Sequence, residues 1–94
     1  VRAVVEGAGF SLADVDYVVP HQANRRLVER VLDDLGIEHD RAWFNVEKYG
    51  NTVAASAFVA LDEANRAGRL EPGKLGVLMA IGAGMTWGAH LIRW

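Results

Sequence analysis

The sequence contains no cysteine and only two prolines among its 94 residues. Without cysteine, the chain cannot form a disulfide, a thiolate metal site or a cysteine nucleophile of its own. No apolar run approaches the roughly 20 residues that span a bilayer, and residues 1–10 lack the plan of a signal peptide. The formal net charge of −2 argues against a general nucleic-acid-binding protein. We therefore expect neither a membrane nor a nucleic acid as partner.

The composition is that of an ordinary soluble globular domain, with 51% hydrophobic and 23% charged residues. A chain of this length forms one small domain, here residues 1–94. It starts at Val1, and "VRAVVEGAGF" reads as the end of a helix closed by Gly7 and Gly9. We expect a segment cut from a longer protein, with a processed mature terminus as the alternative.

The residue pattern predicts four strands and two main helices. The expected strands cover 15–19, 43–46, 75–82 and 87–94, and the expected helices cover 23–35 and 51–67. Ser11 is a plausible N-cap of a short turn, and Asn51 or Thr52 of the second helix. The order strand, helix, strand, helix, strand, strand predicts an α/β fold with a mixed sheet, crossover helices and a closing β-hairpin. Two main helices can cover one face of this sheet, so the other face needs cover from elsewhere.

Three polar or glycine-rich features follow successive predicted strands. His21 follows the first strand, Asn51 follows the second, and the turn Gly82-Ala83-Gly84 follows the third. The carboxyl ends of parallel strands share one edge of a sheet, where ligands of α/β proteins bind. A neutral histidine and an asparagine amide donate hydrogen bonds, and a glycine turn frees backbone N–H groups. Together they can stabilise a developing oxyanion.

Each of these features also has a structural interpretation. His21 could be a hydrogen-bonded residue without catalytic function, and Asn51 could be a helix cap. The "GAGMTWG" turn could be a simple bend, because it lacks the following helix of a dinucleotide-binding fingerprint. Their joint occurrence at three strand ends is what favours a common site.

A cluster of arginines follows His21 in the first predicted helix: Arg25, Arg26 and Arg30. Arg26 and Arg30 are four residues apart and so share a helix face. This face is either simply solvated or steers an acidic partner or a phosphate. His39 and His90 lack metal-ligand spacing, so we expect no metal site. The acidic residues of the helices are interpreted as surface charges: Glu29, Asp33, Asp62 and Glu63.

Three stretches, "VPHQANRRL", "YGNTVAAS" and "ALDEANRAGRLEPGKLGVLMAIGAGMTWGAHLIRW", resemble the C-terminal part of β-ketoacyl-acyl carrier protein synthase III. The resemblance runs from about Phe10 to Trp94. It implies most of the C-terminal half of a thiolase-like fold, in which two similar α/β halves pack together. The combination of one histidine and one asparagine, in place of two histidines, resembles type III and not the elongating synthases.

The resemblance implies a decarboxylative Claisen condensation of an acyl-CoA primer with malonyl-acyl carrier protein, in fatty acid or polyketide biosynthesis. By resemblance, His21 and Asn51 are the catalytic pair that hydrogen-bonds the malonyl thioester oxygen as enolate charge develops. Acyl-CoA and malonyl-acyl carrier protein are then substrates, and no cofactor is implied.

Other residues match further parts of the family pattern. Asn24 matches a position near the pantetheine arm of the substrate. Arg26 matches a basic position for docking of acyl carrier protein, which extends to its neighbours Arg25 and Arg30. The turn formed by Gly82, Ala83 and Gly84 matches a glycine-rich oxyanion loop. Ala83 stands where glycine is usual, which keeps the backbone donor but changes the freedom of the loop.

The family's nucleophilic cysteine belongs to the N-terminal half, and this chain has none. We therefore expect the chain alone to be inactive and to need that half as partner. The resemblance also implies a cytoplasmic enzyme that forms a homodimer at full length. Two alternatives stay open: a non-catalytic partner half of a thiolase-fold heteromer, or an acyltransferase to oxygen or nitrogen on the same scaffold.

Overall fold

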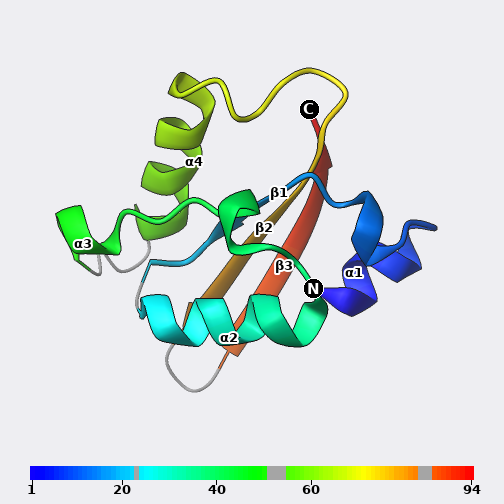
Figure 1. Cartoon of the computed structure of the whole chain (residues 1–94), viewed down its shortest axis with the longest axis horizontal. Helices are drawn as coiled ribbons and strands as arrows, with labels where there is room; N and C mark the ends of the chain where they lie inside the picture. Colours follow the sequence, from blue (N-terminus) through cyan, green and yellow to red (C-terminus); the bar gives the residue numbers. More distant parts are fainter. Residues whose placement is uncertain (23, 51–54, 83–85) are drawn as a thin grey trace.

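The computed structural model describes residues 1–22, 24–50, 55–82 and 86–94 (Figure 1). The elements follow one another as α1 (Arg2–Gly7), η1 (Leu12–Asp14), β1 (Tyr17–Pro20), α2 (Arg25–Leu35), η2 (His39–Arg41), α3 (Val46–Tyr49), α4 (Ser56–Arg66), β2 (Leu75–Gly82) and β3 (Thr86–Arg93). The two η elements are single 3-10 turns. Ser11 caps the first of them through a capping box with Asp14, as its position predicts.

The strands form a mixed sheet in the order β1-β2-β3. β1 pairs with β2 in parallel, with Tyr17 opposite Gly76 and Pro20 opposite Met79. β2 and β3 pair antiparallel along their whole lengths, from Leu75 opposite Arg93 to Gly82 opposite Thr86. The prediction of an α/β fold with a mixed sheet, crossover helices and a closing hairpin is therefore confirmed.

The strand predicted at 43–46 does not form. Ala42 makes one isolated parallel bridge with Val18, and Trp43 N–H donates to the carbonyl oxygen of Val18 at 3.1 Å. The next bond of a parallel ladder would need an N–H from Pro20, and proline has none. The pairing therefore stops after one bridge, and the chain turns into α3.

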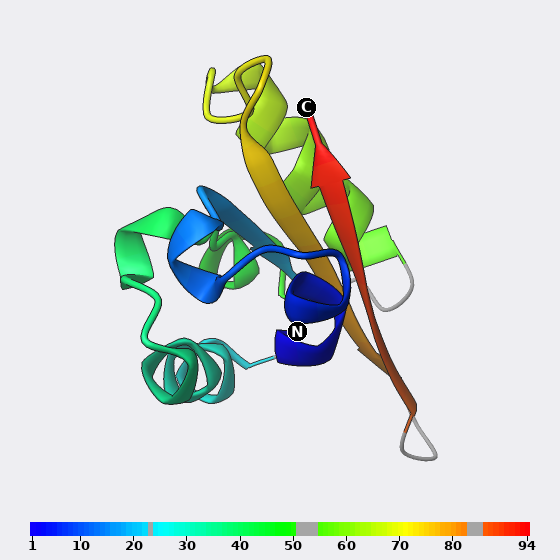
Figure 2. The ribbon, with the colours of Figure 1, turned by 90° about the vertical axis from the view of Figure 1, so that its right-hand side faces the viewer.

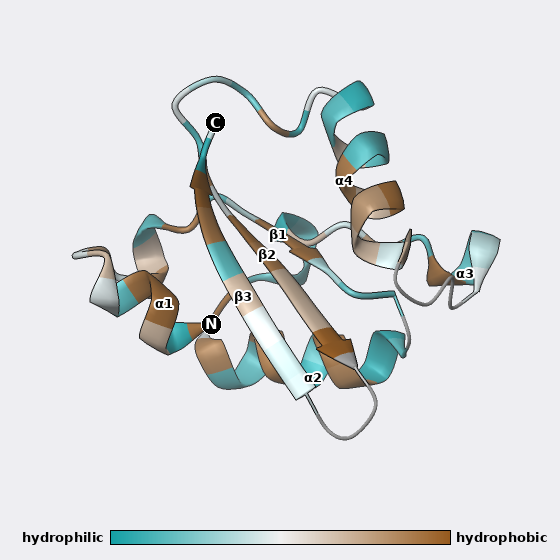
Figure 3. Cartoon of the chain, turned by 180° about the vertical axis from the view of Figure 1, so that it is seen from behind, coloured by the Kyte–Doolittle hydropathy of each residue, from teal (hydrophilic) through white to brown (hydrophobic). Residues whose placement is uncertain are grey.

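Helices cover both faces of the sheet (Figure 2). On one face, Val18 and Val77 pack with Val28 and Leu32 of α2 and with Val5 of α1. On the other face, Tyr17 and Val19 pack with Ala60 and Ala64 of α4. Figure 3 shows that the first half of α4 is apolar and its second half hydrophilic. All four residues of β1 are buried, whereas β3 is largely exposed. Helices thus lie against both faces, and the surface left open lies along β3.

The bounds of the two long helices follow from their end residues. α2 begins at Arg25 because the side chain of Asn24 accepts a hydrogen bond from the N–H of Leu27, at 3.2 Å. It ends at Gly36, whose φ of 71° is the left-handed conformation that glycine adopts readily. α4 begins at Ser56. The caps predicted for it, Asn51 and Thr52, lie outside the described residues.

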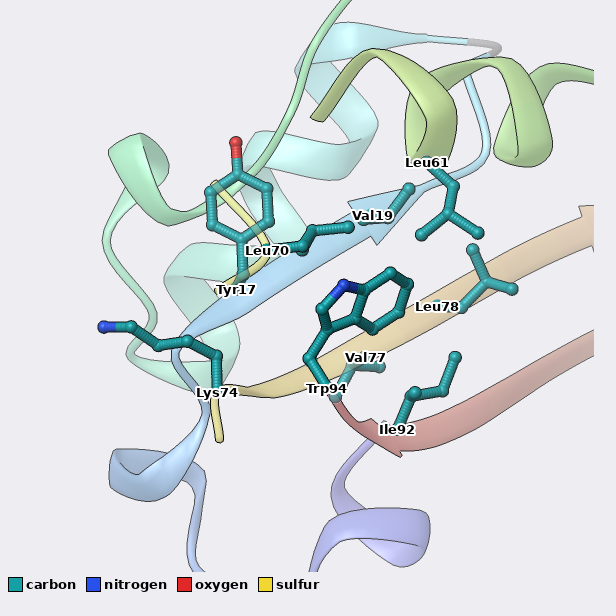
Figure 4. Close-up of a pocket in the computed structure, with 10 residues that line it drawn as sticks. Tyr17, Val19, Leu61, Leu70, Lys74, Val77, Leu78, Ile92 and Trp94 are labelled. Atoms are coloured by element: carbon teal, nitrogen blue, oxygen red, sulfur yellow. The ribbon is translucent and has the colours of Figure 1, made fainter. Parts of the chain in front are cut away.

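The C-terminal residue, Trp94, is fixed over the start of the sheet. Its N–H donates to the carbonyl oxygen of Lys74 at 2.8 Å. Figure 4 shows its indole ring in a small apolar pocket with Leu70 and Leu78, while the amino group of Lys74 points away. The pocket lies over the first half of β2 and is lined on β1 by Tyr17 and Val19. Among the described residues, no helix has the length and apolar character needed to cross a membrane.

Candidate active site

His21 lies directly beyond the carboxyl end of β1. Its backbone N–H donates to the carbonyl oxygen of Met79 on β2, at 2.8 Å, so the residue is held against the neighbouring strand. Gly82 ends β2 at the same edge, because β1 and β2 are parallel. The structure therefore brings two of the sequence-predicted features to one sheet edge. Asn51, Ala83 and Gly84 lie outside the described residues.

The side chain of His21 contacts the start of α4. Nδ1 of its ring forms a hydrogen bond with Oγ of Ser56, the first residue of that helix. The N–H of Gln22 donates to the same Oγ at 3.2 Å. Ser56 is 1% exposed, and His21 is half-buried. The end of β1 and the start of α4 are thus joined through one serine hydroxyl.

The carboxamide of Gln22 replaces the strand pairing that Pro20 prevents. Nε2 donates to the carbonyl oxygens of Pro20 and Trp43, both at 2.9 Å. Oε1 accepts from the N–H of Asn45, also at 2.9 Å. In a regular parallel ladder the N–H of Asn45 would donate to the carbonyl oxygen of Pro20, and the carbonyl oxygen of Trp43 would accept from the N–H of residue 20, which proline lacks. Gln22 is 2% exposed, so its side chain satisfies three backbone groups at a place shielded from water.

Glu63 of α4 fixes the same segment from the other side. Its Oε1 accepts from Asn45 Nδ2 at 2.6 Å and from Trp43 Nε1 at 3.2 Å. Its Oε2 accepts from the hydroxyl of Tyr49 at 3.1 Å. These hydrogen bonds, that from Asn45 above all, hold the pKa of Glu63 below the ordinary glutamate value. Glu63 is therefore more than a solvated charge of a helix surface, because its carboxylate joins α4 to this segment.

An open hollow of about 390 Å³ lies beside His21. We call it the His21 hollow. Its walls are mainly apolar side chains of α4, β2 and β3, and they include His21, Phe58, Ile81, Trp87 and His90. Phe58 is 65% exposed and Trp87 is 77% exposed, although both are large apolar residues. A histidine beside an apolar hollow at a strand end suits a site that binds a substrate.

The first turns of α2 carry the predicted binding residues, all of them exposed. Asn24 uses its Oδ1 as a helix cap, which leaves its amide N–H groups as donors. Arg25 contacts its own chain: it bonds to Glu29 at 2.9 Å and to Glu47 at 2.5 Å, and its guanidinium lies over the ring of Phe44. Within the described part of the chain, Arg26 and Arg30 make no ion pair.

Sequence reasoning missed three polar residues of this region, namely Gln22, Ser56 and Glu63. For Gln22 the sequence offers one clue. A long amide side chain directly after the Pro-His pair that ends the strand can reach the backbone of a neighbouring segment. Ser56 and Glu63 are seven residues apart, so they lie on the same face of α4, two turns from one another. Nothing in the sequence says which segments that face meets.

Comparison with known proteins gives one matching family model. Residues 5–94 match the model described as 3-oxoacyl-[acyl-carrier-protein (ACP)] synthase III C terminal. The beta-ketoacyl-[acyl-carrier-protein] synthase III of Clostridium novyi (strain NT) is 44% identical over 94 residues, which are 100% of this chain and 29% of that protein. A synthase III of Streptomyces coelicolor is 46% identical over 93 residues, 99% of this chain and 28% of its own length.

Solved structures that resemble this chain include members of the same family. The crystal structure of 3-oxoacyl-[acyl-carrier-protein] synthase III from Aquifex aeolicus VF5 superposes with a TM-score of 0.96 at 43% identity, covering 99% of this chain and 30% of that one. The chain therefore spans less than a third of the length of the relatives that it matches.

Proposed function

Because the chain belongs to the family of the C-terminal domains of 3-oxoacyl-[acyl-carrier-protein] synthase III, we propose that it forms one half of a condensing active site. The other half has to supply a cysteine, since this chain contains none. The assembled enzyme would join an acyl-CoA primer to malonyl-acyl carrier protein in fatty acid or polyketide biosynthesis. The observation that carries the proposal is the position of His21, at a strand end beside an apolar hollow.

The proposed reaction has two stages. The cysteine thiolate of the other half first displaces coenzyme A from the primer and becomes an acyl thioester. The malonyl group then loses carbon dioxide, and the electron pair of the broken C–C bond passes to the α-carbon and the thioester oxygen. The α-carbon attacks the acyl carbonyl carbon, and the cysteine thiolate leaves. The product is a 3-oxoacyl thioester on the carrier protein.

His21 and Asn51 would stabilise the enolate formed in the second stage. A neutral imidazole N–H and an amide N–H are donors for the thioester oxygen, and neither has to change its protonation state in this role. A preorganised donor of this kind is worth about 3–4 kcal/mol of barrier, or roughly 10²–10³ in rate. Where the other half of the enzyme closes the His21 hollow, its apolar walls would exclude water from the charge and strengthen such hydrogen bonds.

The remaining residues would bind the two substrates. Backbone N–H groups of the turn at Gly82, Ala83 and Gly84 would bind the oxyanion of the acyl-transfer steps. Asn24, whose amide N–H groups are not used by the helix cap, suits the carbonyl groups of a pantetheine arm. Arg26 and Arg30 suit an acidic carrier protein, since both are exposed on one face of α2. We further propose a homodimer in the cytoplasm.

The test is decarboxylation of malonyl-acyl carrier protein by the assembled enzyme, in which this chain is joined to or paired with the cysteine-bearing half. His21→Ala and Asn51→Ala should each lower kcat by about 10²–10³. His39→Ala is the matched control, because His39 is exposed on η2, where it pairs with Asp33. We expect the control to keep the wild-type rate.

Two outcomes would contradict the proposal in different ways. An unchanged rate in His21→Ala would assign the chain to the non-catalytic partner class. Loss of acyl transfer from the primer, with decarboxylation intact, would place His21 in the first stage and favour an acyltransferase to oxygen or nitrogen. Circular dichroism of each variant separates a chemical effect from unfolding.

A further inference from the structure

The ring of His21 is attached to the scaffold at one nitrogen. Nδ1 forms its hydrogen bond with Oγ of Ser56, and this hydroxyl also accepts the backbone N–H of Gln22 at 3.2 Å. Ser56 is 1% exposed, so water cannot readily replace either partner. The tautomer of His21 therefore depends on which atom of this pair carries the bridging proton.

A hydroxyl has one proton to donate and two lone pairs that accept. The Gln22 N–H occupies one lone pair of Ser56 Oγ. If Nδ1 of His21 also carried a proton, Oγ would accept twice, and its own proton would need another acceptor at a buried place. Among the described residues, Nδ1 is the one acceptor that contacts this hydroxyl. Donation from Ser56 to Nδ1 satisfies all three groups together.

We infer that Ser56 is a positioning residue that holds His21 in the tautomer with its proton on Nε2. The catalytic role of this tautomer rests on the proposed function. The tautomer itself can be measured whether or not that function is correct. The backbone of Gln22 fixes the serine oxygen, the serine proton fixes Nδ1, and Nε2–H remains as the donor of the ring. His21 would then meet an enolate oxygen with a donor already in place.

The same contact also restricts rotation of the ring. Ser56 is the first residue of α4, and Gln22 anchors the chain after β1 to the carbonyl oxygen of Trp43. A ring held between these two elements loses little conformational entropy when it binds the transition state, and this is the advantage of a preorganised donor. Wrong-tautomer variants of other histidine enzymes lose activity even though their geometry is kept.

The direct test is nitrogen NMR of the assembled enzyme labelled with ¹⁵N in its histidine rings. Spectra are recorded at increasing pH until the ring shifts no longer change, and the tautomer is read at that alkaline limit. Loss of one set of signals in His21→Gln assigns His21. We expect Nδ1 to show the shift of an unprotonated, hydrogen-bonded nitrogen and Nε2 that of a protonated one. A protonated Nδ1 in the wild-type protein would overturn the inference.

Variants at Ser56 test whether the serine is the cause. Ser56→Ala should produce a mixture of the two tautomers and lower kcat for decarboxylation about tenfold, the value of one ordinary hydrogen bond, with KM within about twofold. Ser56→Thr keeps the hydroxyl and should restore both the spectrum and the rate. Ser11→Ala is the matched control, because Ser11 is an exposed serine that caps η1.

The outcomes separate this inference from the proposed function. If His21→Ala abolishes decarboxylation while Ser56→Ala keeps both the wild-type tautomer and the wild-type kcat, the positioning role is wrong and the function stands. If the tautomer changes in Ser56→Ala but His21→Ala leaves decarboxylation unchanged, the contact is real and the proposed function is wrong. Thermal unfolding of each variant identifies any loss that comes from instability.

Discussion

Nε2 of Gln22 donates a hydrogen bond to the carbonyl oxygen of Trp43, 2.9 Å away, at the point where a neighbouring strand would need the N–H that Pro20 lacks. One side chain thus takes the place of a second strand beside β1. Because the Gln22 side chain satisfies these backbone groups, the chain can leave the sheet at Trp43, whose Nε1 then donates to Glu63 of α4. It also sets the position of the Gln22 backbone, whose N–H holds Ser56.

We predict that Gln22→Ala destabilises the protein by about 3 kcal/mol, because it leaves buried backbone groups without partners. Gln22→Glu should cost at least as much, since a carboxylate cannot donate to the carbonyl oxygens of Pro20 and Trp43. The measurement is chemical unfolding of the assembled protein, with the midpoint and the slope fitted separately.

The control is Asn65→Ala, which removes an exposed amide of α4. Its effect should stay within about 0.5 kcal/mol, the usual range for a surface position. A Gln22→Ala variant as stable as this control would show that the carboxamide does not hold the segment at Trp43.

Much of the architecture could be predicted from the sequence, since it depends on local patterns. The apolar spacing from Leu27 to Leu35 predicts α2, and Gly36 marks its end correctly. The two strands 75–82 and 87–94 were expected as a hairpin, and the structure has them as β2 and β3 with a shift of one residue at most. Turn and cap residues carry such information within a few positions.

The failed strand at 43–46 has a non-local cause. Trp43, Phe44 and Val46 favour a strand by propensity, but the decisive groups are Pro20 and Gln22, more than twenty positions earlier. The position of His21 at a sheet edge could be inferred from strand order, whereas its contact with Ser56 could not. Whether a serine hydroxyl meets a histidine ring depends on the packing of α4 against β1, which propensity does not encode.

The pKa of Glu63 gives a prediction for stability against pH. Hydrogen bonds from Asn45, Trp43 and Tyr49 lower this pKa in the folded state below the unperturbed value of 4.5. The folded state therefore binds the proton less readily, and the carboxylate contributes stability above pH 4.5 that is lost as the pH falls through the folded pKa. Urea unfolding between about pH 6 and pH 3 should show a difference between wild type and Glu63→Gln that shrinks toward acid.

The comparison for this experiment is Asp62→Asn, a neighbour on α4 that pairs with Arg66 at the surface. Surface pairs of this kind contribute little, so the variant should follow the wild-type pH profile closely. A constant difference between wild type and Glu63→Gln over the whole range would contradict the assigned role of the carboxylate.

We expect the arginines of α2 to divide into two functions. Arg25 is bound to Glu29, Glu47 and the ring of Phe44, so Arg25→Ala should lower the unfolding temperature and leave the affinity for carrier protein nearly unchanged. Arg26 and Arg30 are exposed on one face of the helix. The double variant Arg26→Glu, Arg30→Glu should raise KM for malonyl-acyl carrier protein about tenfold at low salt, with kcat unchanged.

Salt dependence and a charge-matched control decide this last prediction. The increase in KM should shrink as ionic strength rises toward about 0.5 M, because exposed charges are screened over a few ångströms there. The double variant Arg66→Glu, Arg69→Glu makes the same charge change at exposed positions in and just after α4, and it should leave KM unchanged. α4 covers the opposite face of the sheet from α2. If both glutamate variants raise KM equally, the net charge of the protein is responsible and the α2 face is not a docking site. If neither does, carrier protein binds elsewhere on the assembled enzyme.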